Sequence, residues 1–402
     1  MGGSTPEVFL RNSAADFSVI GEGEFTCLEL LQALRDGTPT NGVEGIAYLD
    51  DEGKFIQTPK RKACNINELP FVDWEIFDME RYFEKSDHAA AEGLVFEESK
   101  SPRVMPVATA RGCAFRCTFC HFVFWDDPYR FRTPQNILKE IQRNIEKYGA
   151  TYINFWDDLS FASAHQVEKM CDEFLASGLK FKWLASVRVD LFSRANLSPD
   201  DALKVAEKMK EAGCYDVGFA LESGNQEILE MMNKKIDVNA FFETVNIFKK
   251  VGITVNTSVV FGYPTESKES IRQTFEQCLK ASVYPSIGFL LPLPYTGMYD
   301  YAKQKGFITD EDRYLESITE RQDICLNMTK MSDEEIMKEI KIGAKQLNDM
   351  LDLGLDENTY IKTKGYKNSK IKKKPIDDPE NMEIIENDVS FNYATTQFEF
   401  QS

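Results

Sequence analysis

Three of the nine cysteines in this 402-residue chain lie close together, in the segment ATARGCAFRCTFCHF. Cys113, Cys117 and Cys120 are separated by three and by two residues. Three thiolates on one short loop can hold three corners of a cuboidal iron–sulfur cluster. The fourth iron then has no protein ligand, and an open coordination position is typical of a reactive metal site rather than a structural one. The segment therefore predicts a reactive iron–sulfur site.

Two other interpretations of these cysteines, a structural zinc site and a disulfide, are less well supported. A structural zinc site normally needs four ligands, often as two separated pairs. His121 is adjacent to Cys120 and poorly placed to close the same tetrahedron, and a disulfide within C-x-x-C would leave Cys113 unexplained. The remaining cysteines are scattered singly, at Cys27, Cys64, Cys171, Cys214, Cys278 and Cys325. We therefore favour iron–sulfur over zinc, and expect Cys171 and Cys278 to pack within helices as small apolar groups.

The elements around this loop follow a regular rhythm from about residue 103 to residue 305. Six strand-like runs alternate with helical stretches at roughly 30-residue spacing, which predicts repeated βαβ units and a parallel sheet. The expected strands are 104–110, 151–156, 181–189, 215–223, 254–262 and 286–293, and helices include 133–149, 163–178, 198–213 and 267–282. A curved sheet or partial barrel places its working loops at the carboxyl ends of the strands, where the cysteine loop lies.

The flanking regions are less regular. Residues 1–42 are expected to form a βαβ-like piece with a strand at FSVIG, and residues 43–102 a hairpin around Asp51–Gly53 followed by a linker. After the core at 103–306, residues 307–356 are expected to be helical, with Ser332 as a helix cap. From 357 to 402 the apolar pattern fades into a lysine-rich and then acidic stretch, which indicates a mobile tail.

The composition of the chain limits the classes of protein to which it can belong. The residues are 43% apolar and 28% charged, as in a soluble globular protein, and no apolar run approaches the roughly 18 residues of a membrane span. No signal-peptide pattern is present, so we expect a cytoplasmic location and free thiols. The formal net charge of −18 argues against a nucleic-acid partner.

The motif C-x3-C-x2-C, with Phe119 before the last cysteine and six βα units after it, resembles the radical SAM superfamily. The resemblance implies an α/β fold built as a partial (β/α)6 TIM-like barrel. It also implies a [4Fe–4S] cluster whose open iron chelates S-adenosylmethionine. An external flavodoxin- or ferredoxin-like donor would supply one electron to cleave that cosubstrate to a 5′-deoxyadenosyl radical. The expected chemistry is methyl transfer, cyclisation or a related reaction on an unidentified small-molecule substrate.

Further resemblances follow the second and third strands. FWDDLSF resembles the family segment that touches the methionyl amino group, which implicates Asp157 and Asp158 as acceptors. Arg188, in SVRVD, is a candidate donor to the methionyl carboxylate. The alternative for Arg188 is a salt bridge to Asp190 or Glu222.

The fourth and fifth strands end in similar family segments. FALESGNQEIL matches an E-S-G pattern in which Glu222 and Ser223 would bond cosubstrate hydroxyl or amino groups, while Gly224 allows the turn. VVFGYPTES resembles the adenine-side segment, with Phe261 to Pro264 supplying an apolar wall and close backbone, and Phe261 and Gly262 as the candidate binding residues. The alternative for Phe261 is ordinary core packing. No catalytic residue beyond these binding residues is identified.

The segment before the cysteines resembles the corresponding part of cobalamin-binding radical SAM proteins. Gly2–Gly3 and Gly21–Glu24 match the end of their Rossmann-like cobalamin domain, so the front is expected to be a C-terminal remnant of that domain. The sequence departs from the pattern because it starts within that domain and has no D-x-H-x-x-G segment. It is expected to be either truncated or a natural short form.

We therefore expect weak cobalamin binding or none, and residues before about 42 to be loosely held because their strand lacks neighbours. With only Cys325 in the C-terminal region, no auxiliary cluster is expected. The alternatives are a cobalamin-independent radical SAM oxidoreductase or cyclase, and a non-catalytic iron–sulfur scaffold.

Overall fold

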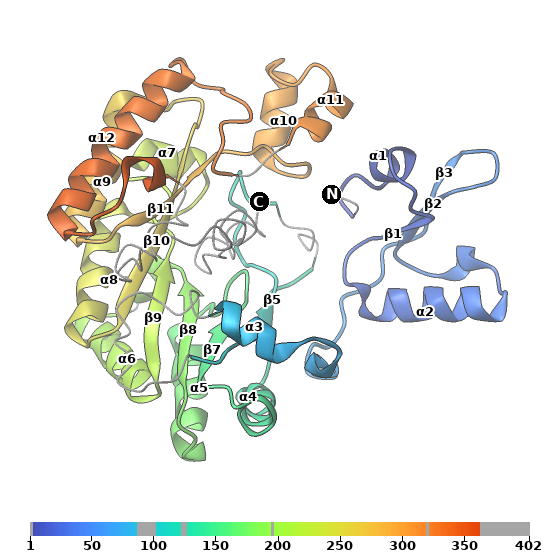
Figure 1. The fold of residues 1–402 in the computed structure, drawn as a ribbon, viewed down its shortest axis with the longest axis horizontal. Coiled ribbons are helices and arrows are strands. Elements are labelled where there is room, and N and C mark those ends of the chain that lie inside the picture. Colours follow the sequence, from blue (N-terminus) through green and yellow to red (C-terminus); the bar gives the residue numbers. More distant parts are fainter. Residues whose placement is uncertain (1–2, 87–101, 122–126, 194–196, 319–320, 362–402) are drawn as a thin grey trace, which may run out of the picture.

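The computed structural model describes residues 3–86, 102–121, 127–193, 197–318 and 321–361. Six parallel strands form one curled sheet in the order β11-β10-β9-β8-β7-β4, with helices on its outer face (Figure 1). The strands are β4 Val104–Val107, β7 Tyr152–Phe155, β8 Lys182–Val187, β9 Cys214–Phe219, β10 Thr254–Phe261 and β11 Pro285–Phe289. All pair in parallel, so the predicted partial barrel is confirmed, with β4 and β11 as its open edges.

Helices cross from one strand to the next. They are α4 Pro134–Tyr148, α5 Ala164–Ser177, α6 Pro199–Glu211, α7 Gln226–Met231, α8 Val238–Lys250 and α9 Lys268–Ala281. The side chains of Thr133, Ser163, Ser198 and Ser267 accept hydrogen bonds from backbone N–H groups at the helix starts, as N-caps do. The four helices named from sequence are confirmed, each within a few residues.

The two faces of the sheet differ in polarity. On the helix side Phe155 stacks on Trp183 with ring centroids 5.3 Å apart, and Phe219 packs on Phe248 at 5.0 Å. On the opposite face Ser186 and Asn256 lie in register on either side of Gly218. Because strand side chains alternate between faces, these polar residues point to the inner face of the barrel, away from the helices.

The front of the chain is a small antiparallel unit. It comprises α1 Pro6–Arg11, β1 Phe17–Val19, α2 Gly23–Asp36, β2 Ile46–Leu49 and β3 Phe55–Gln57. The β2–β3 hairpin is confirmed, but β1 pairs with β2 antiparallel, so the predicted βαβ pairing is wrong here. The pairing crosses the boundary expected at residue 42, and the first strand does not lack a neighbour. Gly2 lies outside the described residues.

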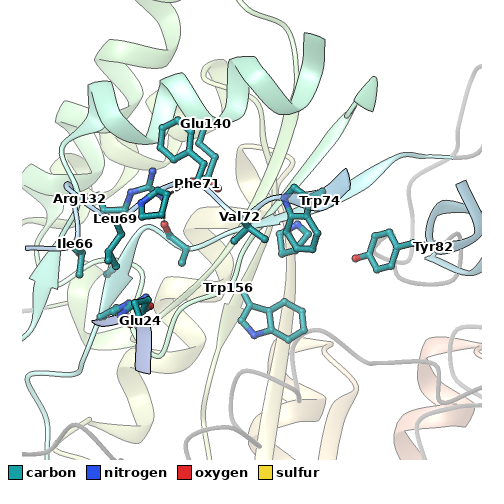
Figure 2. Close-up of a pocket in the computed structure, with 15 residues that line it drawn as sticks. Glu24, Ile66, Leu69, Phe71, Val72, Trp74, Tyr82, Arg132, Glu140 and Trp156 are labelled. Atoms are coloured by element: carbon teal, nitrogen blue, oxygen red, sulfur yellow. Dashed lines mark hydrogen bonds and ion pairs between the residues drawn. The ribbon is translucent and has the colours of Figure 1, made fainter. Parts of the chain in front are cut away.

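A linker joins this unit to the barrel through a short 3-10 helix at Trp74–Ile76 and α3 Met79–Ser86. Arg103, just before β4, donates to Glu80 of α3 at 2.8 and 2.7 Å. Between the linker and the edge strand β4 lies a cavity of about 640 Å³ (Figure 2). Residues 87–101 of the predicted linker lie outside the described residues.

After β11 come α10 Gly297–Gln304, α11 Glu311–Ser317 and α12 Asp333–Leu351. Ser332 caps α12 in a capping box with Glu335, as predicted. Gly343 of α12 lies against the Phe275 ring of α9, so close that a methyl group would not fit. Within the described part of the chain, no helix has the length and apolar character needed to cross a membrane. The predicted tail falls almost wholly on 362–402, outside the described residues.

Candidate functional site

The cysteine loop leaves the carboxyl end of β4 between two short paired strands, β5 Ala110–Arg111 and β6 Arg130–Phe131. Its three cysteines are free thiols and line a single cavity. Residues from the ends of three neighbouring strands and from the loop after α7 share this cavity, among them Phe119, Asp158, Arg188 and Lys234. The structure thus brings together six of the eleven residues expected from sequence, and adds Lys234.

Thr118, in the middle of the loop, ties its backbone to the barrel. The Thr118 N–H donates to the Met232 carbonyl at 2.9 Å, and the Met298 N–H donates to the Thr118 carbonyl at 2.9 Å. The Thr118 hydroxyl donates to the Met231 carbonyl at 2.9 Å and lies 3.1 Å from the Tyr263 hydroxyl. The loop is therefore held at the ends of α7, β10 and α10 by protein contacts alone.

His121 is engaged elsewhere. Its Nε2 lies 2.8 Å from the Ser4 hydroxyl and its Nδ1 lies 2.6 Å from the Pro294 carbonyl. Both ring nitrogens are thus used in contacts away from the thiols, which removes the fourth ligand that a zinc site would need. In the described ranges, no three His, Cys, Asp or Glu side chains converge closely enough to hold a single metal ion.

The electrostatics of the cavity are set by burial and by two cations. Burial raises the pKa of the Cys113 thiol, and Arg188 and Lys234 act in the opposite direction. Burial also raises the pKa of the Cys120 thiol, with the neighbouring thiols adding to the rise. A cluster bound by three thiolates carries negative charge, so the two cations complement it.

Glu222 and Lys234 form a buried ion pair beside the thiols. Lys234 Nζ lies 2.9 Å from Glu222 Oε1, and the side chains are 6% and 0% exposed. The second carboxylate oxygen of Glu222 is buried without a hydrogen-bond partner among the described residues. Glu222 also has a φ of 63°, a conformation that costs a non-glycine residue free energy and is found at functional sites. This oxygen is free to accept from a ligand.

The next two residues of the E-S-G turn, Ser223 and Gly224, stabilise the backbone conformation of the turn. The Asn225 N–H donates to the Ser223 hydroxyl at 3.2 Å, and Ser223 is buried. A Cβ at Gly224 would lie 2.5 Å from the Thr274 Cα, so only glycine fits there. These contacts hold Glu222 in place, while Ser223 does not line the cysteine cavity.

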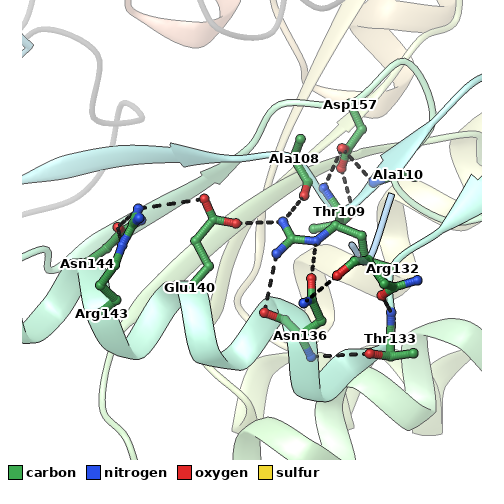
Figure 3. Close-up of polar contacts among 11 residues, drawn as sticks. Ala108, Thr109, Ala110, Arg132, Thr133, Asn136, Glu140, Arg143, Asn144 and Asp157 are labelled. Carbon is green, nitrogen blue, oxygen red and sulfur yellow. Dashed lines mark hydrogen bonds and ion pairs between the residues drawn. The ribbon is translucent and has the colours of Figure 1, made fainter. Parts of the chain in front are cut away.

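The two aspartates after β7 have different surroundings. Asp157 accepts from the Thr109 N–H at 2.7 Å, the Ala110 N–H at 2.9 Å and the Thr109 hydroxyl at 2.6 Å (Figure 3). Burial raises its pKa to about 6 although these bonds oppose the rise. Asp158 lines the cysteine cavity, and burial together with the Asp157 charge raises its pKa to about 7. Asp157 therefore fixes the start of the cysteine loop, and Asp158 faces the site.

Beside Asp157, Arg132 holds the other end of the loop. Its guanidinium donates to the Ala108 carbonyl at 2.6 Å, to Glu140 at 2.6 Å and to Asn136 at 2.7 Å (Figure 3). Ala108 precedes β5 and Arg132 follows β6, so this network closes the base of the β5–β6 hairpin. Both ends of the cysteine loop are thus tied to β4, β7 and α4.

Arg188 is held by protein groups on three sides. Its Nε donates to Asp190 at 2.9 Å, Nη2 donates to the Lys234 carbonyl, and the guanidinium carbon lies 3.6 Å from the Phe115 ring centroid. The salt bridge to Asp190 is therefore present, while Glu222 pairs with Lys234 instead. Arg188 still lines the cysteine cavity.

The adenine-side residues lie apart from the cavity. Phe261 stacks on Phe275 of α9, with centroids 5.7 Å apart, which places it in the core rather than on a ligand wall. Gly262 has a φ of 101° and its N–H donates to Glu266 at 3.3 Å. Tyr263 instead reaches the site, since its ring lies 6.4 Å from that of Phe119.

The front unit docks on the base of the cysteine loop through Glu22. This carboxylate, 7% exposed, accepts from Arg130 at 2.6 Å and from the Cys64 N–H at 3.0 Å, and it lies 3.2 Å from Arg111. Burial would raise the pKa of Glu22, but the hydrogen bonds from Arg130, Cys64 and Arg111 lower it to about 2. Gly21–Glu24 border a cavity of about 290 Å³ that Trp156, Asp157 and Asp158 share.

Comparison with known proteins agrees with this geometry. Residues 107–278 match the model of the radical SAM superfamily. The chain is 30% identical over 302 residues to an uncharacterized methyltransferase of Pyrococcus horikoshii, covering 74% of this chain and 60% of that protein. It is 25% identical to a cytidylyl-2-hydroxyethylphosphonate methyltransferase of Streptomyces wedmorensis, and the match covers 83% of this chain and 65% of that protein. It is also 25% identical to an anaerobic magnesium-protoporphyrin IX monomethyl ester cyclase of Rubrivivax gelatinosus, and this match covers 77% of this chain and 53% of that protein.

Two solved structures share the fold. One is the cobalamin-dependent S-adenosylmethionine radical enzyme OxsB with aqua-cobalamin and S-adenosylmethionine bound, with a TM-score of 0.56, 18% identity, and coverage of 76% of this chain and 41% of that chain. The other is the radical S-adenosylmethionine methyltransferase TsrM of Kitasatospora setae, with a TM-score of 0.56, 16% identity, and coverage of 76% and 57%. At these identities the likeness establishes the fold alone. The chain spans less than two thirds of each of these five proteins.

Lys234 is a site residue that sequence reasoning missed. Lys234 belongs to MMNKK, where a lysine pair normally indicates an exposed helix end. Positive φ values at Asn233 and Lys235 turn this segment inward, and that turn has no glycine to mark it. Tyr263, by contrast, belongs to the segment from Phe261 to Pro264 that the sequence places on the adenine side.

Proposed function

The chain belongs to the radical SAM superfamily, and on that premise we propose that it cleaves S-adenosylmethionine reductively for radical chemistry on a small molecule. The observation that carries the proposal is the convergence of three free cysteines with Asp158, Arg188 and Lys234 on one cavity at the carboxyl edge of a parallel barrel. In parallel barrels this edge is where active sites lie.

The cluster would be held by Cys113, Cys117 and Cys120. Three free thiols around one cavity, with two cations beside them, fit a [4Fe–4S] cluster that keeps one iron open. When bound and reduced by an external flavodoxin- or ferredoxin-like donor, the cluster supplies one electron that breaks the C5′–S bond of S-adenosylmethionine, giving methionine and a 5′-deoxyadenosyl radical. The protein holds the loop rigid through Thr118.

Binding of the cosubstrate would use the charged side chains that line the cavity, together with Glu222 beside it. Glu222 has one carboxylate oxygen fixed by Lys234 and one buried oxygen without a partner in the described part of the chain. That oxygen is placed to accept from an ammonium or hydroxyl group. Asp158 would accept from the methionyl amino group and Arg188 would face the methionyl carboxylate, as charge-assisted pairs that are stronger than neutral ones. Ser223, Phe261 and Gly262 would support these residues from behind.

The reaction on the substrate is proposed from the relatives. Of the three relatives found by sequence, two are named as methyltransferases and one as a cyclase. We therefore propose methyl transfer or cyclisation on a small molecule. Glu22 and Gly23 border the cavity between the front unit and β7, which is the surface a corrinoid would meet. This chain alone is expected to hold cobalamin weakly, since its front unit provides only a three-stranded antiparallel sheet.

The test is production of 5′-deoxyadenosine by anaerobically reconstituted, dithionite-reduced protein supplied with S-adenosylmethionine. We expect 5′-deoxyadenosine and methionine in equal amounts, and no product from Cys117→Ala. Cys171→Ala is the matched control, because Cys171 is buried in α5 and does not line the site. Wild-type protein that carries its full iron content but forms no 5′-deoxyadenosine would favour a non-catalytic iron–sulfur scaffold.

A further inference from the structure

The proposed chemistry leaves unused a cavity of about 640 Å³ beside the edge strand β4, called here the linker chamber (Figure 2). It is bounded by the linker at Ile66–Trp74, by Tyr82 of α3, by Pro106 and Ala108 at the end of β4, and by Trp156. Most of these side chains are apolar or aromatic. Cavities of this size, lined in this way, hold small organic molecules.

The linker chamber and the cysteine cavity share lining residues with one intermediate cavity. Trp156 lines the linker chamber and also the adjoining cavity of about 290 Å³, which Asp157 and Asp158 share. Asp158 in turn lines the cavity of the three cysteines. Trp156 and Asp158 are separated by one residue at the carboxyl end of β7. A molecule that contacts Trp156 in the linker chamber is therefore close to Asp158, which lines the cysteine cavity.

The polar groups of the linker chamber indicate what kind of molecule it takes. Its charged groups are paired within the protein, since Arg132 bonds Glu140, and Arg111 bonds Glu24. The indole N–H of Trp74, however, is buried and has no hydrogen-bond partner among the described residues. A buried donor without a partner costs free energy that a ligand acceptor would recover. The linker chamber therefore offers an aromatic surface, charged groups that are already paired, and one hydrogen-bond donor.

We propose that the linker chamber binds the apolar body of the substrate, an uncharged ring system carrying a carbonyl or ether oxygen that accepts from Trp74 Nε1. The ring system would pack against Trp156, and the reacting part would extend past Asp158 toward the cysteines. This assignment rests on the proposed function, because it names the class of substrate on which the radical chemistry acts. A corrinoid, or a segment of the chain itself, is an alternative occupant that the test separates.

The probe is 6-propionyl-2-dimethylaminonaphthalene, an uncharged naphthyl ketone whose fluorescence shifts to the blue in apolar surroundings. We expect saturable binding near one probe per reconstituted chain, and about tenfold weaker binding by Trp74→Phe, which keeps the ring but loses the donor. Trp156→Ala is expected to weaken binding at least as much. Phe307→Leu is the control, because Phe307 is 39% exposed and does not line the linker chamber. Absence of saturable binding, or equal affinity in Trp74→Phe and Phe307→Leu, overturns the assignment.

Two further measurements connect the linker chamber to the reaction. In wild-type protein that cleaves S-adenosylmethionine, saturating probe is expected to change the cleavage rate at least twofold, because a molecule packed on Trp156 would lie beside Asp158, which lines the cysteine cavity. An unchanged rate overturns the substrate role while the proposed function stands. Probe binding in a sample that cleaves no S-adenosylmethionine instead contradicts the proposed function. Displacement of the probe by stoichiometric aquacobalamin would assign the linker chamber to a corrinoid and overturn the proposal.

Discussion

Glu22→Gln removes the charge that joins the front unit to both strands at the base of the cysteine loop. The pKa of Glu22 falls from 4.5 to about 2, which corresponds to about 3 kcal/mol at about 1.4 kcal/mol per unit. Arg111 and Arg130 remain 27% and 16% exposed, so solvent screening reduces the expected loss to about 2 kcal/mol. A loss of this size is about a 30-fold change in the local opening equilibrium.

The assay is amide hydrogen exchange of β1, α2 and the β5–β6 hairpin, since exchange reports the free energy of local opening. We expect about 30-fold faster exchange in Glu22→Gln at pH 7. Glu29→Gln is the matched control, because Glu29 pairs with Arg61 but is 48% exposed, and it should change exchange no more than about twofold. Because the folded-state pKa of Glu22 is lowered, its stabilisation is complete above about pH 4.5 and is lost as the pH falls toward about 2. Equal exchange in the two variants at pH 7 would refute the reasoning.

Three other predictions concern the site. Asp158→Ala and Glu222→Ala should each weaken S-adenosylmethionine binding by roughly tenfold to a hundredfold in isothermal titration while iron content stays unchanged; unchanged binding in both would make these carboxylates structural. Asp157→Asn should instead lower the iron content after reconstitution, because an amide cannot accept from all three donors at Thr109 and Ala110; full iron content would contradict its positioning role. Cobalamin should separate from this chain during gel filtration, and stoichiometric retention would show that the barrel face and linker grip it.

The barrel could be predicted from the sequence because the signals for its strands and helices are local and repeated. Four of the barrel helices start at a Ser or Thr, and strand-like apolar runs alternate with the helices, so this alternation predicts a parallel sheet. The cysteine loop was found for the same reason, since its spacing is contained in eight residues. What pairs with β1 depends on contacts between distant segments, and the antiparallel partner β2 lies beyond a whole helix.

The side-chain roles were harder to predict than the backbone. Asp157 and Asp158 are identical in sequence terms, and only their directions after β7 separate a loop anchor from a residue that faces the site. Phe261 alternates onto the helix side of its strand, which the segment VVFG does not reveal. Lys234 reaches Glu222 because two residues beside it adopt positive φ without glycine. Each of these roles depends on the direction in which the side chain points, and residue type alone does not determine that direction.

The central claim is that Cys113, Cys117 and Cys120 hold a cluster with one iron open to S-adenosylmethionine. Electron paramagnetic resonance of the reconstituted, reduced protein, with and without S-adenosylmethionine, tests it most directly. We predict about four irons per chain and a cluster signal whose g values change when S-adenosylmethionine is added, and neither in Cys117→Ala. A full iron content in Cys117→Ala, or a wild-type signal that S-adenosylmethionine leaves unchanged, would contradict the claim.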